Sequence, residues 1–428
     1  MEQATTARDN RISQMADGLQ GSEIIKLAGE IRARMAQGEK IFNFTIGDFN
    51  PAIFPIPEKL ETAIKDAYAE GMTNYPAANG MLELREAVRN HVIAKLGLDY
   101  SADEILIAGG ARPLIYATYQ ALVDPDDTVI FPVPSWNNNH YTHLSRGNAV
   151  FVETSSENNF MPTADDLSDH IQGARLVAVC SPLNPTGTVF NEGQLRSICE
   201  LIVAENQRRA VNDEKPVYLM FDQIYWQLTY GDVKHFDPVS LIPAVRDYAI
   251  YIDGLSKSYA ATGVRVGWGF GPQVVMNKMR AILGHIGAWS PKAEQMATAK
   301  YLANTSDTTD YLDWIRREAV DRLQGFYEGI ESLRNEGHDV RAIPPQAAIY
   351  LTVQFNLKGK TTTTGDILDS TEAITNYLLN AAGLAIVPFY AFGASRSSTW
   401  YRLSIGTSKK EEIPAVIDRL RSALEQLK

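Results

Sequence analysis

GLSKSYAATGVRVGW, residues 254–268, is the segment from which the fold and function of this chain are inferred. It follows a strand-like apolar run, residues 249–252, and places Lys257 among small and hydroxylated neighbours. A lysine that leaves a buried strand loses its proton more readily than one in water, because burial disfavours the ammonium form. The neutral amine can add to an aldehyde and form a Schiff base. The segment therefore predicts a reactive lysine, although an ordinary strand–loop–strand with a solvated lysine has the same local pattern.

Two further residues of this segment are suited to binding phosphate. Ser256 precedes the lysine, and Arg265 follows it between two glycines. A hydroxyl and a guanidinium both donate hydrogen bonds to a dianion, and small neighbours let a bulky ligand approach the backbone. A salt-bridged arginine without a ligand is the alternative interpretation.

Two motifs upstream favour the reactive lysine and the phosphate site over the alternatives. SPLNPTG, residues 181–187, and FDQIY, residues 221–225, each follow an apolar run. Together with residues 254–268 they resemble the class I/II aminotransferases among the fold-type I pyridoxal-phosphate enzymes, of the aspartate and aromatic aminotransferase kind. Their order and spacing also fit that family, and the resemblance extends over residues 48–407, nearly the whole chain.

The resemblance implies a set of catalytic residues. Lys257 holds the cofactor as a Schiff base and then moves the α-proton of the substrate. Asp222 pairs with the pyridine nitrogen and keeps it protonated, which makes the ring a better electron sink. Tyr225 and Asn184 donate hydrogen bonds to the phenolic oxygen of the ring. A helix N-cap after the strand is the alternative role for Asp222.

A glycine-rich turn gives a second phosphate contact. Residues 104–108 form a predicted strand, and Gly110, Ala111 and Arg112 lead into a helix expected from Pro113. A strand, a glycine turn and a helix N-terminus bind phosphate through free backbone N–H groups and the helix dipole. A tight connection without a ligand is the alternative, and the order of the motifs favours phosphate binding.

The remaining cofactor contacts come from the resemblance alone. Trp136 matches the aromatic residue that stacks on the cofactor ring, whereas a core tryptophan is the alternative. Tyr75 matches a tyrosine that reaches the phosphate of the partner subunit in a homodimer. By itself, a tyrosine before a proline is usually a surface residue.

Substrate contacts are expected near both ends of the chain. WYRLSIG, residues 400–406, resembles the segment whose arginine, here Arg402, binds the substrate α-carboxylate through its planar guanidinium. Gly47 lies in a loop that is expected to cover that carboxylate. Asn184 is expected to contact the substrate as well. A solvent-exposed strand arginine is the alternative for Arg402. Phe389 and Tyr390 are bulkier than the family pattern and are expected to narrow the substrate pocket.

Composition limits the class of protein. The 428-residue chain is 45% hydrophobic and 21% charged, with a formal net charge of −11. These values indicate a large globular protein and argue against a nucleic-acid surface. Cys180 and Cys199 have no spacing typical of a metal site or a disulfide, and Cys180 is interpreted as a core residue. No secretory signal or membrane span is recognised, so a cytoplasmic protein without a metal site is expected.

Strands and helices alternate through the middle of the chain, so the expected fold is α/β. A mostly parallel sheet flanked by helices is expected to form a large domain, with a smaller α+β domain beside it. The predicted strands are residues 128–131, 149–152, 176–179, 217–221, 249–252 and 266–270. The expected divisions are residues 1–56 for an N-terminal arm and the first part of the small domain, 57–307 for the large cofactor-binding domain, and 308–428 for a long linking helix and the rest of the small domain.

The predicted function is transfer of an α-amino group between an L-amino acid and a 2-oxo acid such as 2-oxoglutarate. Aspartate is the leading donor, followed by aromatic or prephenate-type substrates, and Arg112 or Ser22 could contact a side-chain carboxylate. A pyridoxal-phosphate-dependent lyase or cyclising synthase is an alternative, because the same residues serve several reactions on this scaffold. A cofactor-sensing regulator is a non-enzymatic alternative, but the sequence shows no DNA-binding module.

Overall fold

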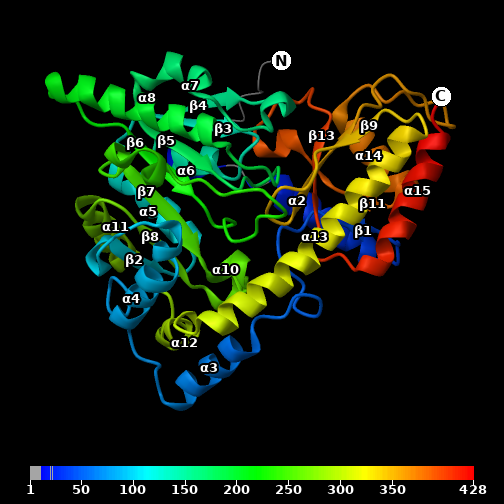
Figure 1. Ribbon diagram of the computed structural model, residues 1–428. Coiled ribbons are helices and arrows are strands. Elements are labelled where there is room, and N and C mark those ends of the chain that lie inside the picture. Colours follow the sequence, from blue (N-terminus) through cyan, green and yellow to red (C-terminus); the bar gives the residue numbers. More distant parts are fainter. Residues whose placement is uncertain (1–10, 20, 22) are drawn as a thin grey trace.

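The computed structural model describes residues 11–19, 21 and 23–428 of the chain. These residues form a larger part around a seven-stranded sheet and a smaller part around a four-stranded sheet (Figure 1). The long helix α13 (Thr305–Asn335) runs between the two parts. The predicted α/β fold with a large and a small domain is therefore confirmed.

The large sheet has the strand order β2-β8-β7-β6-β5-β3-β4. Its bounds are β2 (Ile105–Ala108), β3 (Thr128–Val133), β4 (Asn148–Glu153), β5 (Ala174–Cys180), β6 (Tyr218–Asp222), β7 (Ala249–Gly254) and β8 (Gly267–Phe270). Strands β4, β3, β5, β6 and β7 pair in parallel, whereas β8 is antiparallel to both of its neighbours. The carboxyl ends of β5, β6 and β7 consequently lie at one edge of the sheet.

Helices cover both faces of this sheet, and the side chains of its strands alternate between the two faces. Ala249 and Tyr251 of β7 belong to one buried cluster, whereas Ile250 and Ile252 belong to another. Apolar residues on both faces are expected for parallel strands between two helical layers. The helices of this part are α3 (Glu58–Ala69), α4 (Leu82–His91), α5 (Ala111–Leu122), α6 (Asn138–Leu144), α7 (Ala164–Ile171), α8 (Glu192–Val211), α9 (Pro238–Leu241), α10 (Leu255–Ser258), α11 (Gln273–Ile286) and α12 (Lys292–Leu302).

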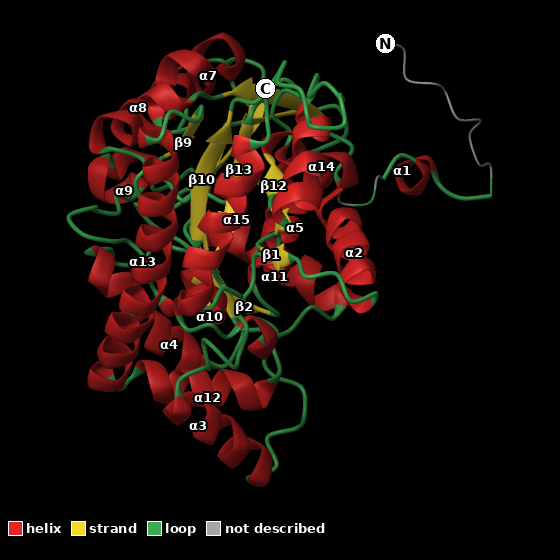
Figure 2. Cartoon of the chain, turned by 90° about the vertical axis from the view of Figure 1, so that its right-hand side faces the viewer, coloured by secondary structure: helices red, strands yellow, loops and turns green. Residues whose placement is uncertain are grey.

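The small sheet is antiparallel, in the order β12-β13-β10-β9, and a separate parallel pair joins β1 to β11. Figure 2 shows α14 and α15 beside β10 and β13. The bounds are β1 (Phe42–Asn43), β9 (Val340–Ala342), β10 (Tyr350–Phe355), β11 (Leu384–Ala385), β12 (Val387–Pro388), β13 (Trp400–Ser404), α14 (Thr371–Ala382) and α15 (Ile413–Glu425). Two further helices near the N-terminus are α1 (Gln14–Asp17) and α2 (Glu23–Ala36).

The linking helix buries an apolar stripe along one side. Ile315 and Leu323 of α13 are buried in the core of the small part, whereas Leu312, nearer the start of the helix, is buried in a core cluster of the large part. The helix begins at Thr305 rather than at residue 308, because the Asn304 side chain accepts a hydrogen bond from the Asp307 backbone N–H and caps the helix there.

An N-terminal segment packs with the small sheet although it precedes the large domain in sequence. In this segment β1 forms a short parallel ladder with β11. The Phe44 carbonyl accepts a hydrogen bond from Ser404 N–H, and Asn50 N–H donates to the Gly406 carbonyl. These bonds hold residues 44–50 along the end of β13 and lead them toward the large sheet.

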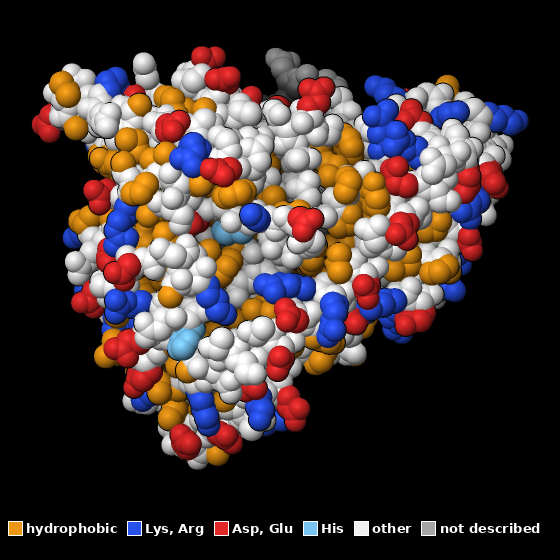
Figure 3. All heavy atoms as spheres, in the orientation of Figure 1, with side chains coloured by type: hydrophobic (Ala, Val, Ile, Leu, Met, Phe, Trp, Pro, Cys, Tyr) orange, Lys and Arg blue, Asp and Glu red, His pale blue; other side chains and the backbone are white. Residues whose placement is uncertain are grey.

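Acidic and basic side chains are interspersed on the face shown in Figure 3, in keeping with the formal net charge of −11. None of the helices in the described part of the chain is both long and apolar enough to cross a bilayer.

The stripe on α13 gives a test of the core. Leu323→Ala is expected to lower the free energy of unfolding by about 2–5 kcal/mol, because Leu323 is 0% exposed and its truncation leaves a cavity. Val211→Ala at the exposed end of α8 is the control and is expected to stay within about 0.5 kcal/mol of the parent. Chemical denaturation followed by circular dichroism measures both. Equal stability of the two variants would contradict the packing described for α13.

Candidate active site

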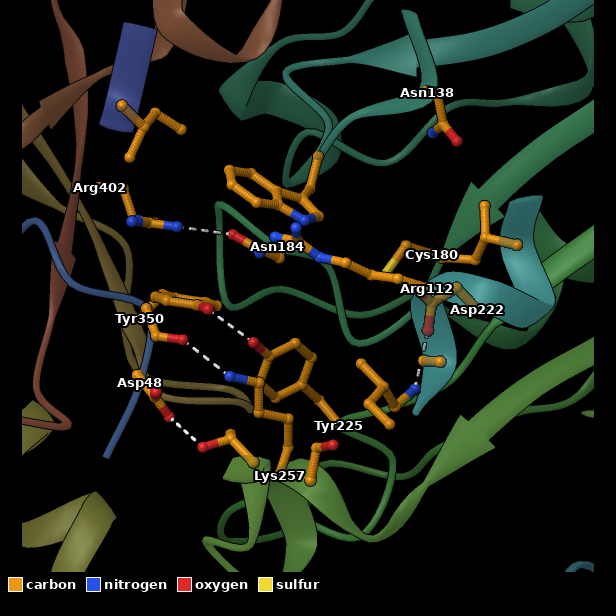
Figure 4. Close-up of a pocket in the computed structure, with 18 of the residues that line it drawn as sticks. Asp48, Arg112, Asn138, Cys180, Asn184, Asp222, Tyr225, Lys257, Tyr350 and Arg402 are labelled. Atoms are coloured by element: carbon orange, nitrogen blue, oxygen red, sulfur yellow. Dashed lines mark hydrogen bonds between the residues drawn. The ribbon is translucent and has the colours of Figure 1, made fainter. Parts of the chain in front are cut away.

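A cavity of about 560 Å³ lies where the carboxyl ends of β5, β6 and β7 meet residues 47–48 and β13 (Figure 4). Ligands of doubly wound sheets bind at this edge. Most of the predicted site residues line the cavity: Gly47, Ala111, Arg112, Trp136, Asn184, Asp222, Tyr225, Ser256, Lys257, Arg265 and Arg402. The structure thus brings together residues that are separated by more than three hundred positions in sequence.

Lys257 lies on the single-turn helix α10, directly after β7. Its Nζ donates a hydrogen bond to the Gly47 carbonyl at 2.7 Å, so the amine faces the segment from the small part. Burial lowers the pKa of Lys257 to about 8, the Asp48 carboxylate acts in the opposite direction, and three guanidinium groups lower it further. A substantial fraction of the amine is therefore neutral near pH 8, as addition to an aldehyde requires.

Asp222 ends β6 at the floor of the cavity. Its Oδ1 accepts a hydrogen bond from Ile224 N–H at 3.0 Å within a turn, so it does not cap a helix there. Burial raises the pKa of Asp222 to about 6. Within residues 23–428 no basic side chain forms an ion pair with it. A buried carboxylate in this position is suited to a cationic N–H group of a ligand.

Cys180 corrects one sequence interpretation. It was expected in the core, but it ends β5 beside Asp222 and lines the cavity. Its Sγ donates to the Pro182 carbonyl, and burial raises the pKa of the thiol well above its usual value. Strand β5 ends at Cys180, so this side chain lies at the edge of the sheet that faces the cavity, and its apolar character alone does not distinguish that position from the core.

Tyr225 and Asn184 each contact a residue of the small sheet. The Tyr225 hydroxyl lies 2.6 Å from the Tyr350 hydroxyl, and Asn184 Oδ1 accepts a hydrogen bond from Arg402 Nη1 at 3.0 Å. Burial, followed by the Tyr350 hydroxyl, raises the pKa of Tyr225 well above its usual value. Tyr225 therefore stays protonated near neutral pH and can donate a hydrogen bond to an anionic oxygen of a ligand.

The N-terminus of α5 forms one end of the cavity. Gly110 has a φ of 97°, a conformation that favours glycine, and a β-carbon at Gly267 would lie only 2.4 Å from the Gly110 carbonyl carbon. Arg265 donates through Nη2 to the Gly109 carbonyl at 2.7 Å and through Nη1 to the Thr262 carbonyl at 2.8 Å. The helix begins at Ala111, two residues before the predicted start, so Pro113 lies in its first turn.

Arg402 lies at the opposite end, on β13, and is 2% exposed, which excludes the solvent-facing alternative. Its Nη2 donates to the Thr45 carbonyl at 2.6 Å, while its Nε is buried and makes no hydrogen bond. No carboxylate of the described chain pairs with this guanidinium. A β-carbon at Gly47 would lie 3.3 Å from Nη1, so the glycine keeps open the space beside Arg402.

Trp136 and Arg112 form one wall of the cavity. The Arg112 guanidinium carbon lies 5.4 Å from the centre of the Trp136 ring, a cation–π contact. Arg112 is exposed toward the cavity, and within the described residues it has no carboxylate partner. The side chain is thus available to an anionic ligand.

Some predicted residues lie elsewhere. Tyr75 is 81% exposed, packs edge-on against Trp289 at 5.2 Å between ring centres, and is outside the cavity of its own chain. Ser22 lies outside the described residues. Gly110 stands behind Ala111 and contacts Arg265.

Phe389 and Tyr390 were expected to narrow the substrate pocket, but their side chains lie elsewhere. Phe389 is buried against Phe160, and the Arg396 guanidinium lies over the Tyr390 ring. Neither residue is among those that line the cavity.

Sequence reasoning also missed several lining residues. These are Ile24, Asp48, Ile115, Asn138, Cys180, Thr262 and Tyr350. Asp48 and Thr262 stand inside or beside motifs already recognised, so their proximity to Gly47 and Arg265 was a usable signal. Ile24 and Tyr350 come from a helix and a strand whose contacts with the cavity depend on how the two domains pack.

The fold and the cavity define a fold-type I enzyme of the aminotransferase kind. Residues 39–420 match the family described as aminotransferase class I and II. The chain belongs to that family, and it is an aminotransferase.

The names of similar proteins agree with this assignment. The chain is 28% identical to an aspartate aminotransferase of Rhizobium meliloti over 410 residues, which is 95% of this chain and 94% of the relative. It is 29% identical to a probable aspartate/prephenate aminotransferase of Rickettsia prowazekii, over 87% of this chain and 90% of the relative. Its structure resembles the crystal structure of the Rhizobium meliloti enzyme with a TM-score of 0.87 and 26% identity, over 97% and 99% of the two chains. For the Thermus thermophilus aspartate aminotransferase with maleate, the TM-score is 0.84 at 26% identity, over 96% and 99%.

Pyridoxal 5′-phosphate is the cofactor of this family and of this chain. The residues present fit it: a lysine with a lowered pKa, a buried carboxylate without a cation, and a glycine-rich helix start beside Arg265 all face one cavity. These groups match an aldehyde, a pyridinium N–H and a phosphate, respectively.

The burial of Lys257 leads to a prediction for the cofactor-free protein. The reaction of Lys257 with acetic anhydride, followed by peptide mass spectrometry, is expected to rise with pH around a midpoint near 8, because neutral amine is the reacting form. Lys59 on the exposed face of α3 is the internal control, because it reports the labelling of a solvent-exposed lysine in the same sample. A shared midpoint for the two lysines would contradict the buried environment described for Lys257.

Proposed function

We propose that this aminotransferase moves the α-amino group of an L-amino acid, aspartate foremost, to a 2-oxo acid such as 2-oxoglutarate, with Lys257 bound covalently to the cofactor as a Schiff base in the resting enzyme. The observation that carries the proposal is the position of Arg402. It is a buried guanidinium with no carboxylate partner in the described chain, and it faces the cavity that contains the Lys257 amine. A buried arginine of this kind favours a ligand carboxylate that it can bind through two parallel hydrogen bonds.

Lys257 and Asp222 have complementary roles in this proposal. The bound cofactor supplies an electron sink for the carbanion that forms when the α-proton leaves. Asp222 holds the proton on the pyridine nitrogen. Once the substrate amine has displaced it from the cofactor, the free Lys257 amine would hold the α-proton at Nζ and then give it back, and a pKa of about 8 suits both transfers.

The other cofactor contacts divide between the ring and the phosphate. Tyr225 and Asn184 donate hydrogen bonds to the phenolic oxygen, and Trp136 stacks on the ring. The phosphate is bound by Ser256, Arg265 and the backbone of Gly110, Ala111 and Arg112, where the start of α5 supplies N–H donors and the positive end of its dipole.

The substrate is bound at both of its ends. Arg402 holds the α-carboxylate, with Asn184 and the Gly47 loop beside it. The Arg112 side chain, unpaired within the described residues, contacts the side-chain carboxylate. Maleate, a dicarboxylate, is named with the Thermus thermophilus relative, which supports a donor with two carboxylates. Aromatic or prephenate-type donors are the next candidates.

The proposal includes a homodimer with shared sites. Tyr75 is exposed and lies outside its own cavity, as expected for a residue that reaches the phosphate site of the partner subunit. Domain limits at residues 56/57 and 307/308 and a cytoplasmic location stay predictions.

The proposed reaction is tested by absorbance of the cofactor-loaded protein. Aspartate added without an oxo acid is expected to convert the visible or near-ultraviolet band to one at shorter wavelength, and 2-oxoglutarate is expected to reverse the change. Lys257→Ala is expected to lower the rate of conversion by roughly 10²- to 10⁴-fold, since the proton-transfer group is lost.

The alternatives predict different outcomes in the same experiment. Release of ammonia or pyruvate with no reversible change in the band would contradict amino transfer and support the lyase reaction. Conversion by phenylalanine but not by aspartate would keep amino transfer and overturn the proposed donor.

The proposed contact of Arg112 with the side-chain carboxylate gives a test of specificity. Arg112→Gln is expected to lower kcat/KM for aspartate about ten- to hundredfold, the loss expected for a charged hydrogen bond, with little change for alanine. Arg317→Gln, at an exposed arginine of α13, is the matched control. Equal losses of kcat/KM for aspartate and alanine would instead mean that Arg112 contacts the cofactor or only supports the cavity wall.

A further inference from the structure

Among the hydrogen bonds that join the two domains at the cavity, the one between Thr262 and Asp48 is not explained by the functions proposed above. The Thr262 hydroxyl donates to Asp48 Oδ1 at 2.8 Å, and both residues line the cavity (Figure 4). Thr262 begins the short 3₁₀ helix η5 (Thr262–Val264) of the large domain. Asp48 belongs to residues 44–50, which pack along the small sheet. Neither residue has a role in the functions proposed above.

The position of Asp48 is fixed on the side of the small domain. Its Oδ1 also accepts a hydrogen bond from Phe49 N–H at 2.8 Å. A β-carbon at Gly406 would lie 2.0 Å from the Asp48 carbonyl oxygen, so this loop lies directly against the end of β13. Since Asn50 N–H also donates to the Gly406 carbonyl, the loop has little freedom to move away.

On the side of the large domain, the Asp48–Thr262 hydrogen bond lies between Lys257 and Arg265, the arginine proposed to bind the phosphate. The Thr262 carbonyl accepts a hydrogen bond from Arg265 Nη1, and Lys257 Nζ donates to the carbonyl of Gly47, the residue before Asp48. The Asp48–Thr262 bond therefore holds the carbonyl that orients the Lys257 amine.

We propose that Asp48, held in place by Thr262, is a positioning residue for Lys257: it fixes the Gly47 carbonyl against the amine and supplies negative charge that offsets the guanidinium groups around it. The inference rests on the role proposed for Lys257 and adds two residues that control it. A hydrogen bond that served only to join the domains would leave the acid–base behaviour of the amine unchanged.

The charges around the amine support this role. The titratable and charged groups that share the cavity with Lys257 are Asp48, Arg112, Cys180, Asp222, Tyr225, Arg265, Tyr350 and Arg402. Among the charges that act on the pKa of Lys257, that of Asp48 raises it, and those of Arg402, Arg112 and Arg265 lower it. Asp48 thus keeps the amine in a range where it can both accept and donate a proton.

Two substitutions separate the charge from the hydrogen bond. Asp48→Asn keeps an oxygen that can accept from Thr262 but removes the charge. Thr262→Val keeps the charge and the shape but removes the donor, and Thr262→Ser restores the hydroxyl. Asp99→Asn, at an exposed aspartate paired with Arg89, is the control for a lost carboxylate.

The measurement is the pH dependence of Lys257 acetylation by acetic anhydride in the full-length, cofactor-free protein, read by peptide mass spectrometry. In Asp48→Asn the midpoint is expected to fall by about half a unit or more, which makes Lys257 about threefold more reactive at neutral pH. Thr262→Val is expected to shift the midpoint in the same direction, because Asp48 is no longer held beside the amine. Thr262→Ser and Asp99→Asn are expected to match the parent protein.

The proposal would be overturned if the midpoint of Lys257 acetylation were unchanged in Asp48→Asn. It would also be overturned if Thr262→Val lowered the stability of the protein but left that midpoint at the parent value. Thr262→Val leaves Asp48 intact and tests the claim even where the Asp48 variant fails to fold. Because no substrate is turned over, a failure of the proposed aminotransfer reaction is distinguishable from a failure of this inference.

Discussion

The buried amine of Lys257 is the constraint on which the rest of the site depends. An ammonium group in this position loses most of its hydration, and its hydrogen bond goes to the neutral Gly47 carbonyl rather than to a carboxylate. Burial therefore lowers the pKa of Lys257 to about 8 and makes the amine chemically useful near neutral pH. The carbonyl comes from the small domain, so the reactivity of a residue on the large sheet depends on how the two domains pack.

Charge balance explains much of the remaining architecture. Arg112, Arg265 and Arg402 all act on the Lys257 amine, while Asp48 opposes them. Arg265 donates to backbone carbonyls, and neither Arg112 nor Arg402 has a carboxylate partner within the described chain. Such an arrangement inside a protein of formal net charge −11 is suited to ligands that bring several negative charges, as a phosphate and a dicarboxylic amino acid together do.

Much of the fold and family could be predicted from the sequence, because the chemistry follows the ends of recognisable strands. Lys257 and Asp222 stand directly after apolar runs, and strand ends in a parallel sheet share one edge. The antiparallel direction of β8 could not be predicted, since a strand buried on both faces has the same pattern in either direction. The contact between Tyr225 and Tyr350 depends on domain packing, and their separation in sequence carries no signal for it.

The central claim is that the cofactor binds covalently to Lys257. The most direct measurement is reduction of the cofactor-loaded protein with sodium borohydride, followed by proteolysis and mass spectrometry of the peptides. The account predicts that the mass of the reduced cofactor is found on the peptide that contains Lys257 and nowhere else. The same mass on another lysine, or none on any peptide after loading, would contradict the assignment of Lys257 and the site built around it.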